Sequence, residues 1–273
     1  MKNRFLPSGR DVPFYCALTV LVCLMCPLRA TAQAADPPWT ALQASYFAGK
    51  KLEAAPFVHL TAPARAASGE QVPFAFSIDH PMTDKHYIKS VSVFVDANPV
   101  PLAAVFHFTP DSGKAEIASR IRLESNSLVH VVAESSDGKF YVNAIEVKAS
   151  GGCAGATPGD DAAAMAAAGQ MKMALVAPVK LKGVNQARLL IRHPMYTGLQ
   201  RNLLTNGFRP AFFINRIEVT YHGKPVLAAD TFIGISENPS IEFGFVAEQP
   251  GALHVVIHDN AGGTYRHSMD IEG

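Results

Sequence analysis

The chain carries an internal repeat, and this feature restricts its fold more than any other. Residues 88–93 match residues 214–219, and residues 128–132 match residues 252–256. The offset between the copies stays nearly constant along this part of the chain. Such a long offset indicates duplication of a whole domain, because a solenoid would repeat at a much shorter period.

Each copy alternates between two kinds of side chain with the period of a half-buried β-strand. In the first copy one series is Ile117, Ser119, Ile121 and Leu123, and the other is Glu116, Ala118, Arg120 and Arg122. The second copy alternates in the same way at Ile241, Phe243, Phe245 and Ala247, and again at Tyr265, His267, Met269 and Ile271. Turn sequences such as Ser-Asp-Gly at 136–138 and Ala-Gly-Gly at 261–263 separate the strands. These patterns predict an all-β protein with two immunoglobulin-like β-sandwich domains.

The first 34 residues have the pattern of a secretory signal peptide. A basic start is followed by an apolar run at 14–26 and by the small-residue motif Ala32-Gln33-Ala34. The run is too short to span a bilayer comfortably. We therefore predict cleavage after Ala34 and a location in the periplasm, and an uncleaved membrane anchor is the alternative.

The remaining chain divides into three segments. We predict a first β-sandwich at 35–150, a cysteine-bearing arm and linker at 151–172, and a second β-sandwich at 173–273. A short helix around residues 38–47 leads into the first domain, with Trp39, Leu42 and Tyr46 on one side. The linker is rich in glycine and alanine, a composition that favours a flexible chain.

Charge and motif content exclude several classes of function. Charged residues make up 17% of the chain, and the formal net charge is +1. We therefore expect no nucleic-acid partner, and no membrane partner after signal cleavage. No cofactor, metal site or catalytic residue is predicted. A copper site at His80 and Met82 is an alternative, but a His-Pro-Met sequence more often forms a turn at the end of a strand.

Cysteine usage supplies the functional clue. Three of the four cysteines, Cys16, Cys23 and Cys26, lie in the predicted signal peptide, which leaves Cys153 alone. A single cysteine in an exported protein indicates a reactive thiol or an intermolecular disulfide. Small residues flank Cys153, so we expect an exposed arm that can enter the active site of a partner. Gly151, Gly152 and Gly155 would give this arm its mobility.

Several longer motifs resemble the SoxY and SoxZ families, the paired carriers of bacterial sulfur oxidation. Residues 105–110 with 112–116, and the Gly-Gly-Cys segment at 151–153, resemble SoxY. Residues 191–195 with 197–199, then 213–216 and 238–239, resemble SoxZ. Two departures stand out. A second domain follows the cysteine, and Ala154 replaces the glycine of the family. The arrangement resembles the fused SoxYZ-like carriers associated with quinoprotein dehydrogenases.

The resemblance implies a periplasmic carrier, not an enzyme. Cys153 would be the covalent attachment site for a sulfur-containing intermediate, which the protein presents to sulfur-oxidising enzymes or to a periplasmic quinoprotein dehydrogenase system. The SoxY-like and SoxZ-like halves would contact each other within the chain. Two alternatives stay open: a non-covalent adaptor for a quinoprotein dehydrogenase, and a protein that dimerises through a Cys153–Cys153 disulfide.

Overall fold

A computed structural model of the chain describes residues 38–155, 161–203 and 206–272. The predicted signal peptide, residues 1–34, lies outside this part. Among the described residues no helix has the length and apolar character needed to cross a membrane.

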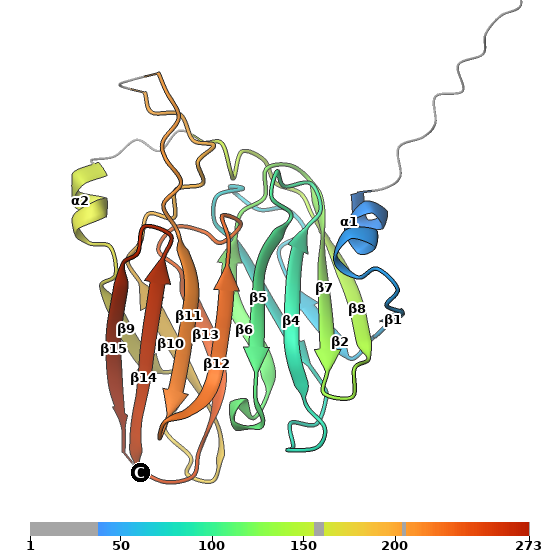
Figure 1. The fold of residues 1–273 in the computed structure, drawn as a ribbon, viewed down its shortest axis with the longest axis vertical. Helices are drawn as coiled ribbons and strands as arrows, with labels where there is room; N and C mark the ends of the chain where they lie inside the picture. Colours follow the sequence, from blue (N-terminus) through green and yellow to red (C-terminus); the bar gives the residue numbers. More distant parts are fainter. Residues whose placement is uncertain (1–37, 156–160, 204–205, 273) are drawn as a thin grey trace, which may run out of the picture. The chain divides into compact units, whose positions relative to one another are not determined.

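Strands dominate both halves of the described chain (Figure 1). The first half contains α1 Pro38–Tyr46, β1 Leu52–Ala54, β2 Val58–Thr61, β3 Val72–Ile78, β4 Ile88–Val95, β5 Leu102–Phe108, the 3-10 turn Pro110–Ser112, β6 Ala115–Ile121, β7 Ser127–Ser135 and β8 Phe140–Val147. The second half contains α2 Asp161–Ala166, β9 Met171–Leu175, β10 Gly183–Ile191, β11 Ile214–Tyr221, β12 Lys224–Thr231, β13 Ser240–Ala247, β14 Gly251–Asp259 and β15 Thr264–Ile271. The prediction of an all-β chain with a short helix near its start is confirmed.

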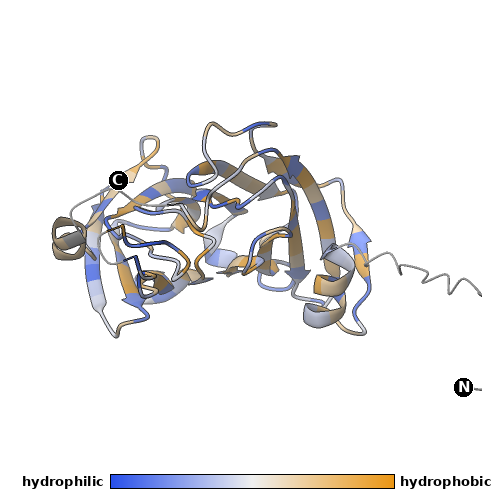
Figure 2. Cartoon of the chain, turned by 90° about the horizontal axis from the view of Figure 1, so that it is seen from above, coloured by the Kyte–Doolittle hydropathy of each residue, from blue (hydrophilic) through white to orange (hydrophobic). Residues whose placement is uncertain are grey.

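The described strands form two sheets. One has the order β1-β8-β7-β4-β5-β12-β11-β14-β15, and the other has the order β2-β3-β6-β13-β10-β9. The period-two alternation explains the layering, because alternate side chains point to opposite faces of a sheet. In β10, for example, Ala187, Leu189 and Ile191 are buried, whereas Arg188 and Leu190 are exposed. Figure 2 shows this banding of hydrophobic and hydrophilic residues along the strands.

Both sheets run through both copies of the repeat. In the larger sheet β5 pairs with β12, and Phe106 lies opposite Ala229. The two strands are neighbours in Figure 1, where the green and orange parts of the chain meet. In the smaller sheet β6 pairs with β13, and Ile117 lies opposite Phe243. The apolar side chains of both copies consequently pack in one continuous core.

The N-terminal helix α1 packs on the first copy. The ring of Trp39 stacks on His130 with centroids 3.8 Å apart and an interplanar angle of 4°. His130 in turn bonds Asp96 at 2.9 Å. Leu42 and Phe47 pack against a small buried cluster that includes Phe94. The only tryptophan of the chain therefore reports on the first copy.

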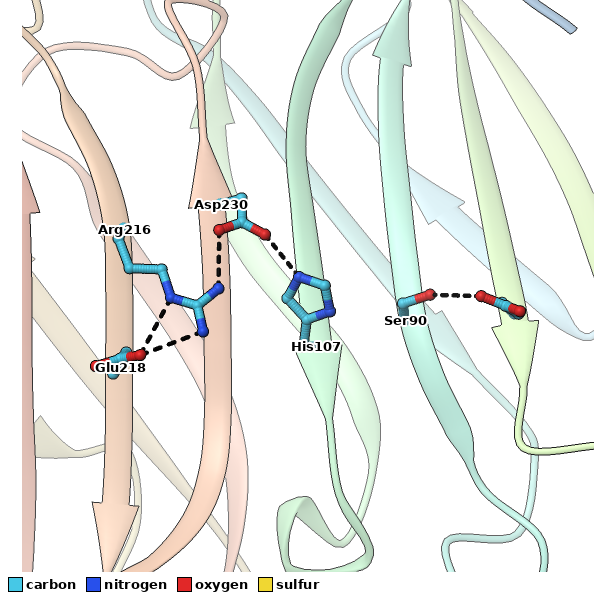
Figure 3. Close-up of polar contacts among 6 residues, drawn as sticks. Ser90, His107, Arg216, Glu218 and Asp230 are labelled. Carbon is cyan, nitrogen blue, oxygen red and sulfur yellow. Dashed lines mark hydrogen bonds and ion pairs between the residues drawn. The ribbon is translucent and has the colours of Figure 1, made fainter. Parts of the chain in front are cut away.

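Polar side chains cross the junction between β5 and β12 (Figure 3). His107 on β5 bonds Asp230 on β12 at 2.8 Å. Arg216 on β11 donates to the other Asp230 oxygen at 2.8 Å and also contacts Glu218 at 3.2 Å. Burial alone would raise the pKa of Asp230, but the hydrogen bonds from His107 and Arg216 outweigh it and leave the pKa below its usual value.

We expect Asp230→Asn to lower the free energy of unfolding by roughly 1 kcal/mol at pH 7, since the Asp230 side chain is 40% exposed and solvent screens its charge. Because the folded pKa is depressed, this stabilisation is present above the unfolded pKa of about 3.9 and is lost as the pH falls through the folded value. Urea unfolding of wild type and variant should therefore differ at pH 7 and converge near the folded pKa. Ser90→Ala, which removes only a long hydrogen bond of 3.4 Å to Glu134 within the first copy, should show a much smaller pH dependence. An equal difference at both pH values would contradict this account.

Candidate functional site

Cys153 lies in a turn that is attached to the body of the sandwich. After β8 the chain continues beside residues 64–69, where the amide of Lys148 donates to Ala64 O and the amide of Gly69 donates to Ser150 O. It then meets the segment that follows β6, where the amides of residues 151 and 152 donate to the carbonyls of residues 124 and 123. The segment is thus held by backbone hydrogen bonds up to the cysteine.

The prediction that Cys153 is exposed is wrong in this structure, because its side chain is only 1% exposed. The physical reason is contact with residues distant in sequence. Thr197, in the second half, donates its hydroxyl to Cys153 O at 2.7 Å. Glu124 accepts the amides of Cys153 and Ala154 at 2.7 and 3.2 Å. Both halves therefore hold the turn, and a thiol in this position cannot reach a second molecule.

Gly152 allows the close approach of three backbone segments. A Cβ added at this position would lie 2.2 Å from Gly69 O and 2.5 Å from Leu123 O. Gly69 is equally restricted, since its Cβ would lie 2.2 Å from the same Leu123 O. Gly151, by contrast, has open space around it and a φ of +74°. The docked turn thus requires glycine at 152 for steric reasons, and the mobility expected of Gly151, Gly152 and Gly155 stays a prediction.

Arg122 is a site residue that the sequence did not reveal. The alternation placed it in the polar series of a strand, but β6 ends at Ile121 and the Arg122 side chain is 1% exposed. Its guanidinium donates to Gly152 O at 2.9 Å and to Met195 O at 3.4 Å. No local pattern marks this role, because the contacts come from residues 30 and 73 positions away.

The docked Cys153 thiol is a poor nucleophile. Burial and the neighbouring Glu124 carboxylate raise the pKa of Cys153 to about 11, against the opposing effect of Arg122. The thiolate is the nucleophilic form of cysteine, so almost none is available near neutral pH. In the docked position the sulfur is therefore both inaccessible and protonated.

The second His-Pro-Met sequence follows β10 and helps to build the site. His193 is 1% exposed, and burial lowers its pKa to about 4, while Asp259 acts in the opposite direction. Its Nδ1 accepts the Met195 amide at 3.1 Å, so this nitrogen is engaged within the turn. Met195 presents its carbonyl to Arg122. No group of three or more His, Cys, Asp or Glu side chains suited to a metal occurs in the described part of the chain.

A basic groove lies at the end of the smaller sheet, near the cysteine turn. It has a volume of about 540 Å³ and is lined by Arg120, Gln170, Met171, Lys172, Leu190, Ile191, Arg192 and Asn238. Arg120 is two residues before Arg122, so their Cα atoms are at most about 7 Å apart. Anything that approaches the turn from this side meets positive charge.

Comparisons with known proteins divide the chain at the cysteine. Residues 43–153 match the family model described as sulfur oxidation protein SoxY, and residues 173–270 match that described as sulphur oxidation protein SoxZ. No curated protein matches the chain.

Solved structures resemble parts of the chain. The sulfur carrier protein SoxY from Chlorobium limicola f thiosulfatophilum is 26% identical, with 41% of this chain and 90% of that chain covered and a TM-score of 0.35. A superoxide reductase (neelaredoxin) from Ignicoccus hospitalis is 14% identical, with 34% and 81% covered and a TM-score of 0.31.

Proposed function

Since this chain belongs to the SoxY and SoxZ families, fused in one polypeptide, we propose that it carries a sulfur-containing intermediate covalently on Cys153. It acts in the periplasm and presents the intermediate to partner oxidising enzymes. In loading, an S–S bond forms between Sγ and a reduced sulfur species such as thiosulfate. The thiol proton is released, and two electrons pass to a partner redox protein.

One observation carries the proposal. Cys153 is the last residue of the SoxY match, and it lies in a turn that residues of both matched segments contact. It is also the only cysteine beyond the predicted signal peptide, so no internal disulfide competes for its sulfur. The small neighbours Gly152 and Ala154 leave the sulfur unobstructed once the turn is released.

Carriage requires the turn to leave its docked position. Release breaks the contacts of Cys153 and its neighbours with Glu124, Arg122 and Thr197. A hydrogen bond to a charged group contributes about 1.5–3 kcal/mol and a neutral one about 1 kcal/mol, so release costs on the order of a few kcal/mol. Binding to a partner enzyme supplies a free energy of this size.

Cys153→Ser should abolish the covalent adduct and the oxidation of the sulfur substrate in cells that depend on this protein. The fold should persist, although the buried hydroxyl costs about 1–3 kcal/mol if it finds no hydrogen-bond partner. Cys153→Ala avoids that cost and serves as the second variant. Substrate oxidation and thermal unfolding are measured together. Unchanged oxidation by both variants would exclude covalent carriage.

A non-covalent adaptor is the second candidate, and the burial of Cys153 favours it. A sulfur that is 1% exposed contributes nothing to chemistry while it stays docked. The adaptor hypothesis predicts that a periplasmic dehydrogenase co-purifies equally well with wild type and with Cys153→Ala. The carrier hypothesis predicts instead that the complex with the partner enzyme depends on Cys153.

A further inference from the structure

The basic groove has three cationic side chains that come from three different strands or strand ends. Arg120 lies on β6, Lys172 on β9, and Arg192 directly after β10. In the smaller sheet β13 separates β6 from β10, and β9 is next to β10. Neighbouring strands lie about 4.8 Å apart. Long side chains from β6 and β9 can therefore converge above Leu190 from opposite sides.

These positive charges lack carboxylate partners. Within the described part of the chain, none of the three forms an ion pair, and the groove lining contains no acidic residue. Arg120 donates to the neutral amide oxygen of Gln71 at 2.8 Å. Through this contact Arg120 is linked indirectly to an acidic residue, because the Gln71 amide donates to Glu237 at 3.2 Å. Like charges that share a groove repel each other, and a bound anion relieves that repulsion.

Elsewhere on the same sheet face, acidic residues lie beside the basic ones. Arg188 on β10 pairs with Glu242 on β13 at 2.6 Å. Further along, a smaller pocket is lined by Glu116, Glu242 and His59 among others. Basic residues on this face are thus neutralised away from the groove and are left without acidic partners inside it.

Neutral hydrogen-bond donors complete the lining. Asn238 and Gln170 contribute amide side chains to the groove. Asn238 is fixed because its backbone amide donates to His193 O at 2.8 Å, and its side-chain oxygen accepts the His193 amide at 3.2 Å. The side-chain NH₂ of Asn238 therefore keeps its donor capacity. Guanidinium, ammonium and amide donors together match the oxygens of a tetrahedral oxyanion.

We propose that this groove is a non-covalent binding site for a divalent sulfur oxyanion, such as thiosulfate or sulfate, beside the cysteine turn. The choice of a sulfur oxyanion rests on the proposed function, whereas the anion site rests on the groove alone. A bound oxyanion would contact Arg120, which is two residues before the Arg122 that holds the cysteine turn. The site therefore raises the local concentration of a substrate for loading or holds a product after transfer.

Calorimetric titration of full-length Cys153→Ser protein with thiosulfate tests the proposal without covalent chemistry. We expect saturable binding at low ionic strength, weakened about tenfold or more by Arg192→Gln because one charge-assisted contact is lost. Arg188→Gln is the matched control, since it removes a paired arginine from the same strand and face. It should leave thiosulfate binding unchanged.

Three results would overturn the site: no saturable binding, equal binding by Arg192→Gln, or equal weakening by Arg188→Gln. Saturable binding of a short Asp/Glu peptide by a protein that does not bind thiosulfate would assign the groove to an acidic protein segment instead. The test is independent of the carrier function, because a chain that never forms a Cys153 adduct can still bind the anion. Conversely, an adduct can form in a chain whose groove binds nothing.

Discussion

Replacing Gly152 with alanine should raise the rate of Cys153 alkylation about a hundredfold at pH 8. The added Cβ would lie 2.2 Å from Gly69 O and 2.5 Å from Leu123 O, and both are backbone atoms that cannot move aside cheaply. The turn must therefore leave its docked position. Its thiol pKa then falls from about 11 to the ordinary value of 9.0, and at pH 8 a pKa lower by two units multiplies the thiolate fraction by about a hundred.

Gly151→Ala is the matched control for this experiment. No atom lies within 4 Å of the Cβ that it adds, although its φ of +74° imposes about 1–2 kcal/mol of backbone strain. We expect it to leave the alkylation rate much closer to that of wild type. Iodoacetamide modification followed by mass spectrometry across pH 7 to 11 measures both rate and pKa. Equal rates for Gly152→Ala and wild type would show that the docked turn does not protect the thiol.

Phe243→Ala should lower the free energy of unfolding by about 3–5 kcal/mol, the usual cost of truncating a buried phenylalanine. Phe243 is 1% exposed and lies opposite Ile117 of the first copy. The core is continuous across both copies, so the loss of stability should extend to both copies. The fluorescence of Trp39, in the first copy, should change at a lower urea concentration even though the substitution is in the second copy.

Urea titration followed by Trp39 fluorescence and by far-UV circular dichroism tests this coupling. In wild type and variant alike, the two signals should give coincident transitions. Leu190→Ala serves as the control, because Leu190 is 43% exposed and its truncation should shift both transitions only slightly. If Phe243→Ala left the urea midpoint of the Trp39 fluorescence change at its wild-type value, the two copies would unfold independently.

Local patterns in the sequence were enough to predict several elements of the fold. The alternation at Ile241, Phe243, Phe245 and Ala247 corresponds to β13, where all four side chains are buried. The helix expected around residues 38–47 is α1 Pro38–Tyr46. Both signals depend on residues close in sequence, and periodicity reports such contacts directly.

Contacts between distant residues were not predictable in this way. The pairing of β5 with β12 joins residues more than a hundred positions apart, such as His107 and Asp230, and no short-range pattern encodes it. Cys153 is surrounded by glycine and alanine, which indicated exposure. Its burial depends on Thr197 and Glu124, which approach only in the folded chain. The same limit applied to Arg122, because strand β6 ends at Ile121, two residues before the end of the predicted alternation at Leu123.

Covalent carriage on Cys153 is tested most directly by mass spectrometry of the intact protein and of its Cys153 peptide. The protein is purified without reductant from its own cells while they oxidise a reduced sulfur compound. We predict an added mass on the Cys153 peptide that corresponds to sulfur atoms, a sulfonate or both, and its disappearance after treatment with a thiol reductant. A free, unmodified Cys153 throughout active substrate oxidation would contradict the carrier function.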